Sequence, residues 1–169
     1  MFRLFLVMVF ALVPPLIVSP SAQADLVTVR LDGFQVKPTV ITEAAGKFTA
    51  RIDRNFEVIT YTLSYRDLQG GVAQASLKIG QAGENGGTVA ILCSNRANAP
   101  RGTPVCLAAP NSIEGTIEWF NVLDLRGQGI REGEMDKVFQ AIDAGAAYVV
   151  VQTGHYPSGE IRGQFAAKR

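Results

Sequence analysis

A two-residue alternation of apolar and polar side chains is the feature that most constrains the fold of this chain. It is clearest in three segments, residues 27–31, 48–53 and 59–65. Successive side chains of a strand point to opposite faces, so this period predicts strands with one buried face. Further strand-like segments follow at residues 72–79, 88–92, 113–120, 147–152 and 160–165.

One segment, residues 133–144, has the helical period instead. Its apolar side chains recur at i, i+3, i+4 and i+7, at Met135, Val138, Phe139 and Ile142. That spacing predicts a short amphipathic helix, and Gly145 follows where a left-handed C-terminal cap is expected. Many short strands with one helix predict an all-β fold, an antiparallel β-sandwich or flattened barrel, with the helix packed on the sheet as a lid or crossover.

The first 24 residues have the pattern of a secretory signal peptide. Arg3 precedes an apolar run at 4–18, and small residues at Ala22 and Ala24 match a cleavage site. A membrane anchor is the alternative, but the run is shorter than the about 20 residues that a span needs and contains two prolines. We therefore expect cleavage near Ala24.

The mature chain, residues 25–169, is then expected to be a single exported domain, periplasmic or secreted, without a membrane span. Loss of Arg3 leaves 15 basic and 15 acidic side chains, with no basic block. Nucleic acids and anionic membrane surfaces attract proteins through concentrated positive charge, so neither is expected as a partner.

The two cysteines, Cys93 and Cys106, flank a segment rich in asparagine, proline and glycine. In an exported chain such a pair is expected to form a disulfide. A metal or redox pair is the alternative, although the spacing differs from Cys-x-x-Cys and no second ligand cluster is present in the sequence.

The end of the chain holds its most distinctive motif. Two strand-like runs flank a turn with Gly154, Pro157 and Gly159, and alternation places Glu160, Arg162 and Gln164 on one face. We interpret these polar residues as an ion pair and hydrogen-bond ladder that fixes the last strand. The alternative is a binding site for an anionic group.

This ending, with Gly159, Glu160, Arg162, Gly163 and Gln164, resembles the closing motif of the CHRD domain, named after chordin. The resemblance extends over about residues 29–166. Its other matching segments are residues 31–38, 42–46, 75–80 and 83–87, the cysteine pair, and residues 128–130 with the helix, Gly145 and Tyr148. It implies a small CHRD domain with a structural role for the closing motif.

The departures from the family pattern bear most on function. Members commonly carry two histidines at alternate positions of the central strand and a third before the threonine of the closing motif. Here these positions hold Ser76, Lys78 and Gln152. Three imidazoles could share a metal ion, whereas an ammonium repels one. We therefore expect neither a metal nor another cofactor.

No catalytic residue is predicted. His155 is the only histidine, and we read it as a solvated turn residue. Glu114 and Glu118 share strand parity, which two catalytic carboxylates of a glycosidase could use, but a solvated strand face is expected. Trp119 and Phe120 are adjacent, so one of them is expected to face away from the core as a small exposed aromatic patch.

The resulting hypothesis is an exported, non-catalytic CHRD-domain protein with a binding or structural role and an unknown protein or glycan ligand. The alternative is a metal-dependent or hydrolytic extracytoplasmic enzyme whose site the sequence does not reveal. The sequence does not predict the oligomeric state of the protein.

Overall fold

The computed structural model describes residues 24–168, and these form one antiparallel sheet of eight strands with one α-helix. The strands are β1 (Asp25–Asp32), β2 (Ala45–Asp53), β3 (Val58–Arg66), β4 (Val72–Ile79), β5 (Gly87–Ser94), β6 (Asn111–Ile117), β7 (Ala147–Thr153) and β8 (Ile161–Gln164). The helices are η1 (Trp119–Asn121), η2 (Arg126–Gln128) and α1 (Met135–Asp143). Apart from Ala24, the predicted signal peptide lies outside the described residues.

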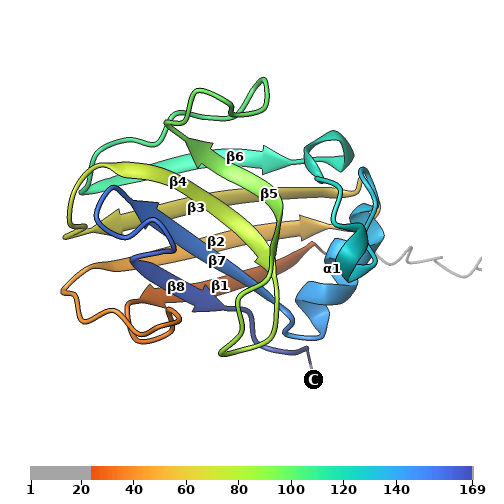
Figure 1. The fold of residues 1–169 in the computed structure, drawn as a ribbon. Coiled ribbons are helices and arrows are strands. Elements are labelled where there is room, and N and C mark those ends of the chain that lie inside the picture. Colours follow the sequence, from red (N-terminus) through yellow and green to blue (C-terminus); the bar gives the residue numbers. More distant parts are fainter. Residues whose placement is uncertain (1–23, 169) are drawn as a thin grey trace, which may run out of the picture.

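The strand order is β5-β4-β7-β8-β1-β2-β3-β6, and the sheet curls into a nearly closed barrel (Figure 1). This confirms the predicted all-β antiparallel fold, in its barrel form rather than as two stacked sheets. The long crossover between β6 and β7 contains α1, which lies at one end of the barrel (Figure 1). None of the helices within residues 24–168 is long and apolar enough to cross a membrane.

The alternation predicted for the strands is present in their burial. On β2 and β3, Phe48, Ile52 and Leu63 are almost fully buried, while the immediate neighbours of each along its strand are more exposed. α1 starts two residues later than predicted, but its four apolar residues are buried in the same core, as expected. The helix therefore closes one end of the barrel with its apolar face.

The edge strands β5 and β6 approach one another but share no strand ladder in the described chain. Other contacts hold this seam together. Cys93 on β5 is joined to Cys106 by a disulfide of 2.06 Å, as the sequence predicted. The Tyr61 hydroxyl of β3 donates to the Leu92 carbonyl across the core at 2.6 Å, and Tyr65 donates to the Leu107 carbonyl at 2.6 Å.

The strand predicted at residues 113–120 is wrong at its C-terminal end. β6 ends at Ile117, because the Glu118 amide donates to Asn121 Oδ1 at 2.9 Å and the chain turns into η1. Trp119 and Phe120 therefore do not alternate. Both are more than half exposed, and their rings meet edge to face 5.7 Å apart. Glu114 lies on β6 but Glu118 lies beyond it, so the two carboxylates do not share a strand face.

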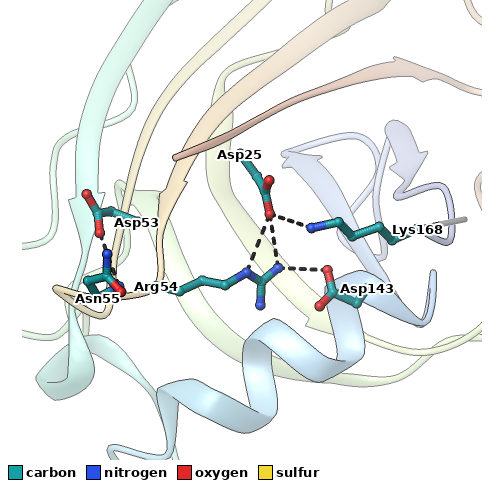
Figure 2. Close-up of polar contacts among 6 residues, drawn as sticks. All are labelled: Asp25, Asp53, Arg54, Asn55, Asp143 and Lys168. Atoms are coloured by element: carbon teal, nitrogen blue, oxygen red, sulfur yellow. Dashed lines mark hydrogen bonds and ion pairs between the residues drawn. The ribbon is translucent and has the colours of Figure 1, made fainter. Parts of the chain in front are cut away.

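Charged side chains tie the two ends of the described chain to the helix (Figure 2). Asp25 at the start of β1 accepts hydrogen bonds from Arg54 at 3.4 Å and from Lys168 at 2.8 Å. Arg54 also pairs with Asp143 at the end of α1, at 2.7 Å. The hydrogen bonds of Lys168 lower the pKa of the Asp25 carboxyl most, and those of Arg54 add to the effect.

Candidate functional site

The three positions to which the resemblance to the family assigned histidines lie on one side of the barrel wall. Ser76 and Lys78 lie on β4, and Gln152 lies on the adjacent strand β7, opposite Gln74. Their neighbours Leu77 and Val151 belong to the core, so these three side chains face outward. The three positions therefore lie on one face of the sheet. We call this surface the outer β4–β7–β8 face, defined by Gln74, Ser76, Lys78, Tyr148, Val150, Gln152, Arg162 and Gln164.

Much of this outer face is buried. Ser76 is 0 % exposed, and Gln74 and Gln152 are each 8 % exposed. Lys78 is half-buried. Burial lowers the pKa of the Lys78 ammonium, and the positive charges of Arg96 and Arg162 lower it further. The position that would need a neutral imidazole for metal binding thus holds a cation that is influenced by two other cations.

Arg162 is the most deeply placed of these cations, at 2 % exposure. Its guanidinium lies over the Tyr148 ring, 3.5 Å from the ring centre. It donates to the carbonyls of Glu84 at 2.6 Å and Gln81 at 2.9 Å, and to the Gln164 amide oxygen at 2.7 Å. Burial lowers the pKa of Arg162, and the Tyr148 hydroxyl opposes this. Through its hydrogen bonds to Gln81 and Glu84, Arg162 therefore holds the β4–β5 loop against the outer face.

Gln164 extends this arrangement to the end of the barrel. Its amide nitrogen donates to the carbonyls of Gly80, Gly145 and Ala147, at 2.8–2.9 Å. These carbonyls belong to the end of β4, the turn after α1 and the start of β7. One side chain of the closing motif thus joins three segments.

Glu160 has a separate set of partners, and the expected ion pair with Arg162 is not formed. Its buried carboxylate accepts hydrogen bonds from the Gln69 amide at 2.8 and 3.0 Å and from the hydroxyls of Thr42 and Thr153, at 3.1 and 2.9 Å. The backbone conformation just before β8 explains why Glu160 does not reach Arg162. β8 begins only at Ile161, after Gly159 with φ +131°, so Glu160 does not follow the alternation of the strand.

The glycines of the motif are explained by close contacts. Gly159 is buried and has a φ that L side chains rarely adopt, and a Cβ there would be 2.5 Å from Val150. A Cβ at Gly163 would collide with the Arg30 carbonyl of the neighbouring strand β1. The motif therefore contains hydrogen-bonding residues and the small residues that let β8 pack closely.

His155 lies in the exposed bend between β7 and β8, as expected for a turn residue. Within residues 24–168, no three histidine, cysteine or acidic side chains are grouped so that they could hold a metal ion. The residues at the family's histidine positions therefore do not fit a metal: they offer a hydroxyl, an ammonium and an amide.

Two residues of this face, Tyr148 and Arg96, were given no role there by the sequence. Tyr148 stacks under Arg162, and Arg96 reaches Gln152 Oε1 at 3.4 Å from the loop after β5. The parity of β7 could have placed Tyr148 on the outer face. No pattern marked Arg96, because it lies in an irregular segment and its position depends on the fold of the disulfide loop.

The comparison with known families agrees with this picture. The model of the CHRD domain family matches residues 27–165, so the chain belongs to the CHRD domain family. No curated protein and no solved structure matches the chain.

Proposed function

We propose that this protein is an exported, non-catalytic CHRD-domain module with a binding role, and that the outer β4–β7–β8 face is its binding surface. The observation that carries the proposal is the half-buried Lys78 ammonium on the outer β4–β7–β8 face, whose pKa is lowered by burial and by the positive charges of Arg96 and Arg162. A cation at this point opposes metal binding and favours a ligand with negative charge.

The rigidity of the surface supports a binding role. Arg162, Gln164 and the disulfide hold the loops and strands that frame it. A site on fixed elements loses little conformational entropy when a ligand binds, which favours affinity. The ligand in this proposal is a protein or a glycan.

The proposed location is outside the cytoplasm, after removal of residues 1–24. The signal-like sequence and the disulfide both support export, because disulfides persist in oxidising compartments. Mass spectrometry of the protein recovered from an exporting cell tests this. We expect a mature chain that begins at Asp25, and a recovered chain that retains residues 1–24 would contradict it.

Metal analysis tests the non-metal part of the proposal. The purified chain is incubated with Zn²⁺ or Cu²⁺, dialysed, and analysed for retained metal. We expect far less than one ion per chain. The matched control is the triple substitution Ser76→His, Lys78→His and Gln152→His, which restores the family's imidazoles on the same face and is expected to retain metal.

A stoichiometric ion in the unsubstituted chain, lost when His155 is replaced by alanine, would overturn the proposal in favour of a metal-dependent enzyme. If the triple variant retains metal and the natural chain does not, the scaffold can hold an ion and the natural residues prevent it.

A further inference from the structure

Three positive side chains converge on the outer β4–β7–β8 face. Lys78 lies opposite Tyr148 in the β4–β7 ladder, and Arg162 stacks on that same tyrosine at 3.5 Å. Arg96 reaches the face from the loop after β5 through its 3.4 Å contact with Gln152. Cations from three separate parts of the chain therefore lie on this face, and Arg96 and Arg162 are near enough to Lys78 for their charges to act on its ammonium.

Within residues 24–168, none of these three cations takes part in an ion pair. The described ion pairs use other basic residues, namely Arg54, Arg66, Arg126, Lys137 and Lys168. Arg162 is committed to carbonyl groups, whereas the Lys78 ammonium donates no hydrogen bond to another described residue. The contact of Arg96 with Gln152 is long and can be exchanged at little cost. Lys78 and Arg96 are thus the two cations with donors to offer a ligand.

The side chains that surround Lys78 and Arg96 on this face are polar and hydrogen-bonded to one another. Gln74 donates to Ser76 Oγ at 2.8 Å, and Ser94 lies 3.5 Å from Gln74 Oε1. The Arg96 amide donates to Ser94 Oγ at 3.1 Å, which fixes the backbone from which the guanidinium projects. Gln152 is held by the Pro157 carbonyl at 2.6 Å. The donors are therefore mounted on buried, hydrogen-bonded groups, as a preorganised site requires.

We propose that Lys78 and Arg96 form a binding site for an oxyanion of the carboxylate, phosphate or sulfate class. A guanidinium can bind two oxygens of such a group, and the ammonium adds a point charge beside it. A bound oxyanion would also neutralise the positive field over Arg162. The inference rests on the proposed function, because it names the ligand class of the same face.

The test is a titration of the ¹⁵N-labelled chain with inorganic phosphate and, separately, with sulfate and acetate, followed by NMR. We expect saturable shifts concentrated at Ser76, Lys78, Arg96 and Gln152. Lys78→Met and Arg96→Gln keep much of the side-chain volume and are each expected to weaken binding about tenfold, the loss of one charge-assisted hydrogen bond. Lys47→Met, at an exposed lysine of β2, is the matched control and is expected to change nothing.

The three probes separate the sources of the oxyanion. A preference for acetate points to an acidic side chain or sugar acid, and a preference for phosphate or sulfate points to an esterified ligand. Shifts spread evenly over the lysines and arginines, or binding unchanged in both Lys78→Met and Arg96→Gln variants whose unfolding midpoints match the natural chain, would overturn the site. That failure would leave the metal analysis unaffected, so it is distinguishable from failure of the proposed function.

Discussion

Arg162 is a buried cation whose partners are carbonyls, an amide and an aromatic ring rather than a carboxylate. Its charge is stabilised by three oriented dipoles and by the face of Tyr148. Removing the guanidinium would leave the Glu84 carbonyl without its donor and the Gln81 carbonyl with only the Glu84 amide, and would free the loop above the face.

We predict that Arg162→Met lowers the free energy of unfolding by about 3 kcal/mol. Arg162→Lys is the informative companion, because an ammonium keeps the charge but cannot make the same forked contacts, and it is expected to recover only part of the loss. Urea unfolding measures both. A loss below about 0.5 kcal/mol for Arg162→Met, the range of ordinary surface substitutions, would show that the loop is held by other contacts.

Glu160 stabilises the opposite end of β8 by accepting from one amide and two hydroxyls. Glu160→Ala is expected to reduce stability markedly, and the isosteric Glu160→Gln by about 2 kcal/mol, because an amide cannot accept at both oxygen positions. Glu114→Gln on exposed β6 is the control and should be neutral. Thermal unfolding that is unchanged for Glu160→Ala would refute this structural role.

Burial raises the pKa of Tyr61 to about 12, from an ordinary value of 10.0. The neutral phenol is therefore favoured in the folded chain. Its stabilising contribution is complete below about pH 10 and is lost as the pH rises towards 12, because the unfolded chain ionises first. Tyr61→Phe is predicted to reduce the loss of unfolding free energy between pH 10 and 12 by about 2–3 kcal/mol. Burial also raises the pKa of Tyr65, so the pH dependence that Tyr65 contributes is expected to remain. Unfolding free energies between these pH values measure the effect of Tyr61→Phe, and identical slopes would contradict it.

At the scale of elements, the seam between β5 and β6 depends on side chains. The disulfide closes a loop with a sequence separation of 13, a length for which the chain-entropy model gives about 3 kcal/mol. Replacing both cysteines with alanine should therefore lower the free energy of unfolding by about 2–4 kcal/mol, measured by urea unfolding. If the double variant is as stable as the natural chain, the tyrosine contacts alone are enough to hold the seam.

The elements themselves were largely predictable, because burial of one face imposes its period on the sequence. Phe48 and Leu63 lie inside as their alternation predicted, and the helix buries its expected face. The prediction failed where local hydrogen bonds override alternation. Glu118 and Asn121 end β6 early, and Gly159 removes Glu160 from the parity of β8. Neither effect is visible in an apolar–polar pattern.

The site could be predicted only in part, for a related reason. The likeness to the family located Ser76, Lys78 and Gln152, and strand parity placed them on one face. The other two cations of this face come from other segments of the chain. Arg96 arrives from an irregular loop, and Arg162 turns to Tyr148 instead of Glu160. Both contacts depend on tertiary structure.

At the scale of the whole molecule, the Asp25 network joins β1, the β2–β3 turn, α1 and the C-terminal tail (Figure 2). The lowered pKa of Asp25 means that its contribution is present above its ordinary pKa of 3.8 and is lost as the pH falls through the lower, folded value. Asp25→Asn is predicted to reduce stability at neutral pH by less than about 1 kcal/mol, since these side chains are partly exposed.

In acid the difference between Asp25→Asn and the natural chain is expected to vanish, and high salt should shrink it at neutral pH. Thermal unfolding at two pH values and two salt concentrations measures this. Asp124→Asn, which breaks only a local pair with Arg126, is the matched control. A difference that grows in acid would show that Asp25 is not stabilised as an anion.

The outer β4–β7–β8 face is the feature on which the functional account depends, and Lys78 reports on it directly. The decisive measurement is an NMR titration of the Lys78 ammonium with pH, in the absence and presence of sulfate, which stays a dianion throughout. We predict a pKa below the ordinary lysine value in the free chain, raised when sulfate binds. A Lys78 that titrates like an exposed lysine and does not respond to sulfate would contradict the account.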